Sequence, residues 1–214
     1  MQPILSVRGV GRTFGSVVAL DDVSFDIRPG ETHAIMGENG AGKSTLMKIL
    51  AGVQRPTSGE LLVRGRPVSF AGTREAEAAG ISMIHQELNL VEQLSVSANI
   101  FLGRELTNGW GVLQQGEMDR RAAALLEQLE TPISPRALVG SLRVGDQQLV
   151  EIARALSLES DILIMDEPTN HLDVSMIEWL EEYLDARKIT LLLVTHDRYF
   201  LDAVCNEIIE IDDE

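Results

Sequence analysis

The chain has 214 residues, a formal net charge of −15 and a hydrophobic fraction of 44%. This length suits one large domain, and no apolar run approaches the ~18 residues of a membrane-spanning helix, so we expect any membrane role to come through a partner. Nucleic-acid phosphates bind Lys and Arg, so direct nucleic-acid contact is not expected of so acidic a chain.

The first third of the chain predicts short strands around one glycine-rich loop. Val23, Phe25 and Ile27 alternate with polar residues, which is typical of a half-buried strand. A compact apolar strand at 33–36 runs into the loop, and residues 44–51 favour a helix that Gly52 ends. Two further short strands are expected at 61–63 and 81–84.

The glycine-rich loop fits the phosphate-binding pattern G-x-x-x-x-G-K-[ST]. Its glycines let backbone N–H groups turn toward phosphate oxygens, a lysine reaches the β- and γ-phosphates, and a hydroxyl binds Mg²⁺. A plain glycine turn beside an exposed lysine is the alternative, while the dinucleotide motif has different glycine spacing. The expected nucleotide-binding residues here are Gly37, Asn39, Gly40, Ala41, Gly42, Lys43, Ser44 and Thr45.

The middle of the chain, roughly 87–160, changes character and predicts a helical lobe inserted into the sheet domain. A loop rich in Gly and Asn at 103–116 precedes a helix at 120–129, and a second helix starts near Gln147. Buried strands follow at 162–165 and 190–194, with an amphipathic helix at 176–186 between them. Strands that alternate with helices indicate an α/β fold with a mainly parallel sheet.

Two acids end the apolar strand at 162–165. Acids in this position face the crevice where ligands bind in parallel sheets. We therefore expect Asp166 to hold Mg²⁺ and Glu167 to orient and deprotonate an attacking water. Solvated turn acids before Pro168 are the alternative interpretation.

Together with further motifs, these segments resemble the ABC ATPase family over nearly the whole chain. Gln86 matches the family's Q-loop glutamine, residues 142–147 its signature loop, residues 170–173 its D-loop, and His196 its switch histidine. Phe14 lies where many members stack an aromatic ring on adenine.

This resemblance implies a P-loop fold with an antiparallel N-terminal β portion, one domain over 1–214, and ATP and Mg²⁺ as ligands. Residues 1–86 and 161–214 would form the nucleotide-binding core, and 87–160 the helical sublobe. It also implies roles for particular residues: catalysis by Glu167, His196 and Gln86, metal binding by Ser44, Gln86 and Asp166, and nucleotide contacts from Phe14, Leu142, Arg143, Gly145 and Gln147.

The signature loop departs from the family pattern at its second position. Arg143 stands where most members have Ser or Thr, whose hydroxyl meets the γ-phosphate bound to the opposite subunit. A guanidinium can bind phosphate, and it can also clash there. The resemblance therefore implies nucleotide binding more strongly than it implies hydrolysis. The resemblance also implies that a second ABC ATPase domain completes the site.

Two branches of the family divide the chain. Residues 1–168 resemble the ATPases of monosaccharide importers for ribose, xylose and galactose, and residues 169–214 resemble the F class that acts on the ribosome. A charge step falls at the same seam, because residues 166–214 hold 14 acidic and 3 basic residues. Our hypothesis is an importer ATPase, cytoplasmic or at the inner face of the cell membrane with a permease subunit. The alternatives are an F-class factor and a recombined or engineered chimera with little turnover.

Overall fold

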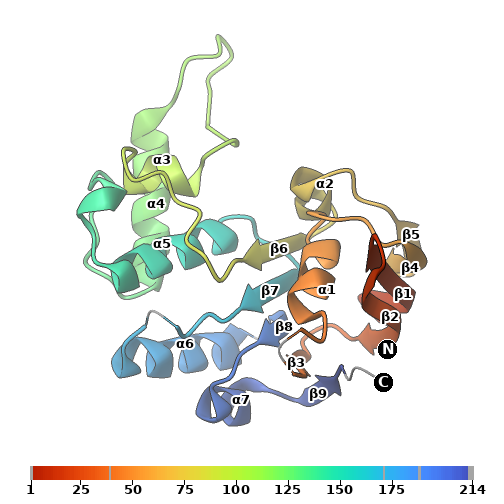
Figure 1. Ribbon diagram of the computed structural model, residues 1–214. Helices are drawn as coiled ribbons and strands as arrows, with labels where there is room; N and C mark the ends of the chain where they lie inside the picture. The colour runs from red at the N-terminus through yellow and green to blue at the C-terminus, as the bar shows by residue number, and fades with distance from the viewer. Residues whose placement is uncertain (1, 39, 171, 188, 212–214) are drawn as a thin grey trace.

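The computed structural model describes residues 2–38, 40–170, 172–187 and 189–211. Its central feature is a five-stranded sheet (Figure 1) in the order β6 (Ile81–Ile84), β7 (Ile162–Asp166), β8 (Thr190–Val194), β3 (Thr32–Met36) and β9 (Glu207–Glu210). Every neighbouring pair runs parallel. Apart from Asp166 and Thr190, strands β7 and β8 are apolar, and they are buried because layers cover both faces of the sheet. The predicted parallel sheet is confirmed.

A second, antiparallel sheet packs against the same core. Its order is β2 (Val17–Ile27), β1 (Leu5–Phe14), β4 (Ser58–Val63) and β5 (Arg66–Val68). Helix α1 (Lys43–Leu50) lies between the two sheets, and its Leu46, Met47 and Ile49 share one apolar cluster with residues of both. The short helix α2 (Thr73–Ala78) connects this layer to β6. The antiparallel portion that the resemblance implied is therefore present.

Residues 87–160 carry α3 (Val96–Ile100), α4 (Gln115–Gln128), a 3₁₀ turn (Val139–Ser141) and α5 (Val144–Leu156). Both long helices begin a few residues before the positions that the sequence predicted. Helices α6 (Val174–Arg187) and α7 (Arg198–Val204) flank β8 in the sequence.

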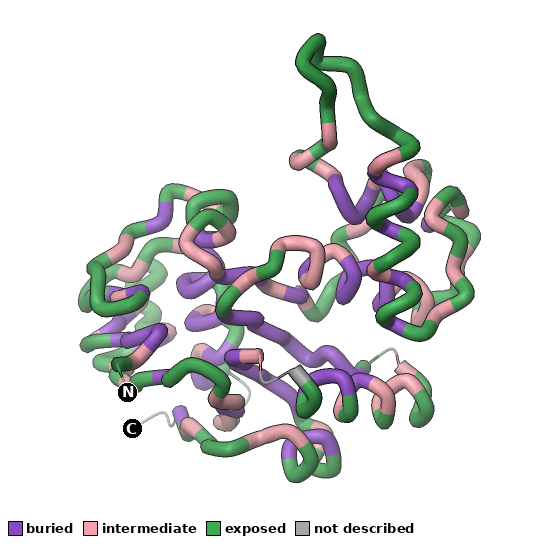
Figure 2. The backbone as a smooth tube through the Cα atoms, turned by 180° about the vertical axis from the view of Figure 1, so that it is seen from behind, coloured by how far each residue is buried: buried purple, intermediate pink, exposed green. Residues whose placement is uncertain are grey.

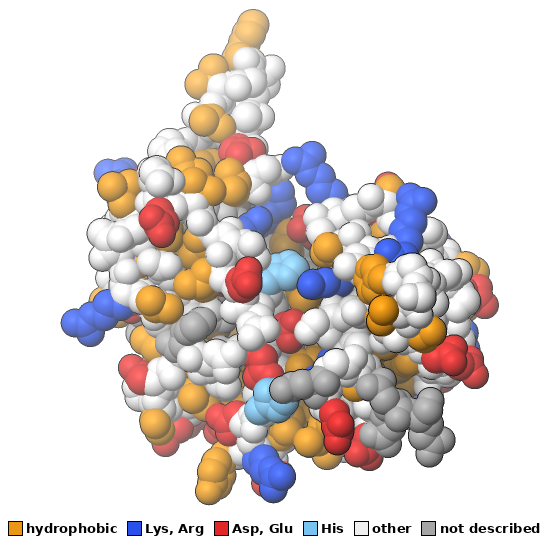
Figure 3. Space-filling model, viewed as in Figure 1, with side chains coloured by type: hydrophobic (Ala, Val, Ile, Leu, Met, Phe, Trp, Pro, Cys, Tyr) orange, Lys and Arg blue, Asp and Glu red, His pale blue; other side chains and the backbone are white. Residues whose placement is uncertain are grey.

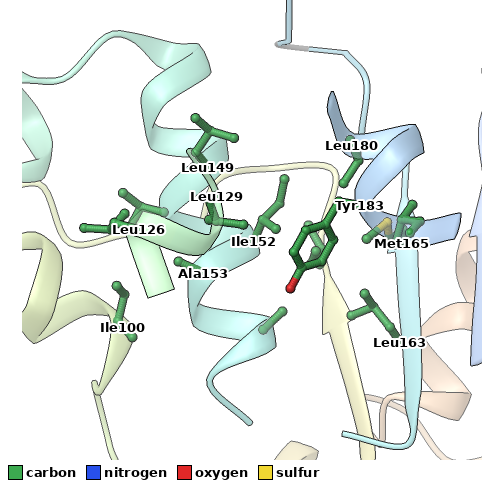
Figure 4. Packing of buried hydrophobic residues seen from close by; sticks show 14 of the residues in the cluster. Ile100, Leu126, Leu129, Leu149, Ile152, Ala153, Leu163, Met165, Leu180 and Tyr183 are labelled. Atoms are coloured by element: carbon green, nitrogen blue, oxygen red, sulfur yellow. The ribbon is translucent and has the colours of Figure 1, made fainter. Parts of the chain in front are cut away.

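One large apolar cluster joins the helical region to the sheet. Side chains of α5 and of the end of α4 meet residues of β7 and α6 (Figure 4). The labelled members include Leu126, Leu129, Leu149, Ile152, Ala153, Leu163, Met165, Leu180 and Tyr183. Burying apolar surface stabilises a fold by roughly 25 cal/mol per Å². The shared cluster therefore holds α5 against β7, the strand that leads to Asp166 and Glu167. In Figure 2 the buried residues are concentrated in these inner layers.

A long loop between α3 and α4 projects from the body as an arm, residues 103–114 (Figures 1 and 2). Its tip is held by its own hydrogen bonds: Asn108 N donates to Val112 O at 2.9 Å, and Asn108 Oδ1 accepts from the N–H groups of Trp110 and Val112. The Trp110 side chain is 91% exposed. Apolar side chains at the arm's tip stand clear of the molecule in Figure 3.

Candidate functional site

The glycine-rich loop leaves β3 and enters α1 through backbone conformations that glycine favours. Gly42 caps α1 with φ 88°, and a Cβ on it would lie 2.1 Å from Ala19 O. A Cβ on Gly37, where φ is 154°, would lie 2.3 Å from Ile211 O. Larger residues at these two positions would push the loop away from the strands behind it. The loop is therefore held close against β2 and the segment after β9.

Lys43 closes the loop from inside. Its side chain is mostly buried, with 9% of the residue exposed, and its Nζ donates to Gly37 O at 2.7 Å and to Glu38 O at 2.9 Å. An ammonium group has three donors, so one remains for an oxygen in front of the loop. The Lys43 ammonium thus belongs to the lining of the cavity in front of the loop.

The ends of four parallel strands bring the predicted polar residues together. The phosphate loop follows β3, Asp166 ends β7 and Glu167 comes next, His196 follows β8, and Gln86 follows β6. They surround a cavity of about 440 Å³. Its lining comprises Gly40, Gly42, Lys43, Ser44, Thr45, Gln86, Asp166, Glu167, Asn170, Val194 and His196. Figure 3 shows acidic, basic and histidine side chains gathered near the middle of this face.

Glu167 is held tightly at the mouth of the cavity. Its backbone has φ 51°, an uncommon conformation for a residue other than glycine, and its N–H donates to Val194 O at 2.8 Å. One carboxylate oxygen accepts from His196 N at 3.3 Å, and the other lies 3.3 Å from His196 Nε2. The uncommon backbone conformation and the contacts with His196 together fix the carboxylate in the cavity lining.

The donors around Asp166 suit Mg²⁺. Asp166 is buried and hydrogen-bonded to Ser44, and Gln86 lines the same cavity. Magnesium takes oxygen ligands and binds proteins through one or two carboxylates together with water and substrate phosphates. The oxygens of Ser44, Gln86 and Asp166 therefore fit Mg²⁺. Burial raises the pKa of the Asp166 carboxyl, and the charges of His85 and Lys48 and the Ser44 hydrogen bond oppose that rise.

The segment after Gln86 is bound to α5 through both backbone polar groups of Asn89. Asn89 N donates to Glu151 Oε1 at 2.7 Å, and Asn89 O accepts from Arg154 Nη1 at 3.2 Å. Burial raises the pKa of Glu151 and lowers that of His85, and both line a second cavity of about 500 Å³. This cavity shares Ser44, Gln86 and Asp166 with the first.

Some predicted residues lie apart from the cavity lining. Phe14 is at the end of β1, Gly37 and Ala41 form the back of the loop, and Leu142, Arg143, Gly145 and Gln147 surround the N-terminus of α5. Asn39 lies outside the described residues. Two further residues line the cavity: Val194, which was not assigned from the sequence, and Asn170, which was placed in the D-loop without a role in the site. For Val194 the available signal was its place at the end of the buried strand β8, whereas Asn170 lies beyond the end of β7 at Asp166.

Fold and cavity together define a P-loop nucleotide-binding domain. The sequence profile of the ABC transporter family matches residues 20–170. A putative ribose/galactose/methyl galactoside import ATP-binding protein of Burkholderia cenocepacia is 48% identical over 91% of this chain. A protein of the same name from Pseudomonas syringae pv. tomato is 44% identical over 99% of it. The chain therefore belongs to the ABC transporter family and is one of its ATPase domains. It spans only 39% of the length of both of these relatives.

Solved structures agree with this assignment. A dimeric bacterial ABC transporter cassette has a TM-score of 0.81 and 26% identity, covering 97% of this chain and 94% of its own. A dimeric post-hydrolysis cassette bound to ADP and phosphate gives the same TM-score and identity. It covers 98% of this chain and 96% of its own. Within the described ranges, none of the helices is long and apolar enough to cross a membrane.

Proposed function

We propose that this chain binds Mg²⁺ and ATP and hydrolyses ATP to ADP and phosphate as the ATP-binding domain of a monosaccharide importer. The observation that carries the proposal is the convergence of Lys43, Ser44, Asp166 and Glu167 on one cavity at the ends of the parallel strands. The names of the relatives favour a sugar of the ribose or galactose type. They favour the importer over the ribosome-associated alternative.

The geometry supports a division of labour among the site residues. Lys43 holds the γ-phosphate, and the glycine loop surrounds the phosphate chain with backbone N–H groups. Bound Mg²⁺ would be held by Ser44, Asp166 and Gln86, and it would neutralise charge on the β- and γ-phosphate oxygens. Glu167 accepts a proton from the attacking water as that oxygen bonds to the γ-phosphorus and the bond to the β–γ bridging oxygen breaks. His196 positions the Glu167 carboxylate.

The assembly is part of the same proposal. Arg143 and the rest of the signature loop lie at the start of α5, outside the cavity lining, which is consistent with their serving the nucleotide of a second domain. We propose residues 1–86 and 161–214 as the core and 87–160 as the sublobe, with a permease subunit as partner at the cytoplasmic face of a membrane. Alignments with some relatives extend over 99% of the chain, past residue 169, and the chimera hypothesis stays a prediction.

Phosphate release from Mg-ATP by the purified chain tests the hydrolytic part. Glu167→Gln should slow the release strongly while binding persists, because an amide cannot take the proton of water. Glu130→Gln is a matched control, since Glu130 has the same left-handed backbone, φ 50°, and is exposed at the end of α4. Equal rates in all three proteins would reject Glu167 as the base.

A pull-down with the tagged chain from solubilised cells tests the choice of partner. Recovery of a membrane permease supports the importer. Recovery of ribosomes in place of a permease would overturn it in favour of the F-class alternative.

A further inference from the structure

An exposed apolar patch adjoins the phosphate loop. The end of the β1–β2 hairpin presents Phe14, Val17 and Val18, which are 44%, 63% and 58% exposed. The next residues along β2 pack directly on the loop, because a Cβ on Gly42 would meet Ala19 O and the Leu20 side chain within 3 Å. The patch therefore continues from the surface that holds the phosphate loop.

Arg12 contacts the aromatic ring of this patch and holds it in place. Arg12 and Phe14 both lie on β1, and their side chains are in contact even though the pairing with β2 shifts register between Arg12 and Thr13. The guanidinium carbon of Arg12 lies 4.7 Å from the centroid of the Phe14 ring, and Nη1 donates to Arg55 O at 2.8 Å. One end of the guanidinium is thus hydrogen-bonded to the loop that follows α1, while the cation lies over the Phe14 ring.

A restrained ring beside a phosphate site suits a purine. An exposed phenylalanine would otherwise sample several rotamers, and a ring already held in place loses less freedom on stacking. Stacking of a base on an aromatic side chain strengthens binding by about 5- to 150-fold. The free energy of an exposed cation–π contact corresponds to a change of about 2- to 5-fold in a dissociation constant. Loss of the Arg12 contact should therefore change nucleotide affinity by at most that factor.

We propose that Arg12 is a positioning residue for the nucleotide base: it holds Phe14 as the surface on which the purine of ATP stacks. This inference rests on the proposed function, because it needs the triphosphate of the same nucleotide in the loop of Lys43. It assigns to Arg12 a contribution that depends on the base and is independent of the phosphates.

Dissociation constants for Mg-ATP and for Mg-tripolyphosphate, which lacks base and ribose, separate the two contributions. Arg12→Met keeps an apolar stem and removes the guanidinium. It should weaken Mg-ATP about 2- to 5-fold and leave Mg-tripolyphosphate unchanged. Phe14→Ala should weaken Mg-ATP about 5- to 150-fold, again without effect on tripolyphosphate. Arg66→Met, the same change at an exposed residue of β5, is the control and should alter neither.

A double-mutant cycle decides whether Arg12 acts through the ring. In a Phe14→Ala background, Arg12→Met should have no further effect on Mg-ATP. An effect that persists there, or an equal loss for both ligands, would show that Arg12 only braces the hairpin against Arg55, and the proposal would be wrong. Tripolyphosphate that binds the wild type as tightly as ATP would also overturn it. A wild type that binds neither ligand would instead reject the proposed function.

Discussion

Lys43 offers the sharpest test of nucleotide binding because the structure limits what it can contribute. Two of its three donors are used by Gly37 O and Glu38 O. With these bonds kept, one charge-assisted hydrogen bond is left for the γ-phosphate. Such a bond contributes about 1.5–3 kcal/mol, so Lys43→Ala should raise the Kd for Mg-ATP by about 10- to 150-fold.

Calorimetric titration with Mg-ATP measures this change, and thermal unfolding without nucleotide shows whether the variant remains folded. Lys48→Ala is the matched control, because Lys48 is an exposed lysine on the same helix whose charge also reaches Asp166. The control should change the Kd much less. A Kd for Lys43→Ala within twofold of wild type, or the same loss in both variants, would refute the assignment of Lys43 to the phosphate.

Three further outcomes are expected. Glu167→Gln should slow hydrolysis by about 10²- to 10⁴-fold with little change in Mg-ATP affinity, as single-turnover kinetics can measure. Hydrogen bonds from Arg28 and His33 lower the pKa of Glu31 to about 2 from its usual 4.5, so its contribution to stability is complete above pH 4.5 and is lost as pH falls toward 2. Chemical denaturation should therefore show the gap in free energy of unfolding between wild type and Glu31→Gln narrowing over that window, whereas a constant gap would reject the linkage. Light scattering should show Glu167→Gln as a monomer that becomes a dimer with Mg-ATP, and a monomer in both conditions would mean that Arg143 does not complete the site of a second copy.

The part of the site that lies in contiguous motifs was predictable from the sequence. Lys43, Asp166 and Glu167 each follow an apolar strand within a few residues, so the local pattern and the parallel-sheet rule place them at one edge. Contacts between distant segments were not predictable in this way. The hydrogen bonds that join Asn89 to α5 depend on how the helical region packs, and no spacing in the sequence reports that packing.

Strands β1, β5 and β9 were not predicted from the sequence, and for β1 and β9 the physical reason can be identified. Strand β1 contains Gly9 and Gly11, and its pairing with β2 shifts register repeatedly between Val7 and Thr13, which breaks the alternation that marks a half-buried strand. Strand β9 is four residues long with an acid at each end. It exists because it pairs with β3, more than 170 residues earlier in the chain.

The arm at 103–114 has a practical consequence for how this domain can vary and be observed. Its tip is closed by hydrogen bonds among its own residues, so lengthening it costs mainly loop entropy, which grows slowly with the number of residues. A change in the length of this segment should therefore leave the layers beneath it intact. The chain has two tryptophans, and Trp110 at the arm's tip is largely solvent-exposed while Trp179 packs against the core. The fluorescence emission of Trp110 should therefore change when a partner covers the tip of the arm.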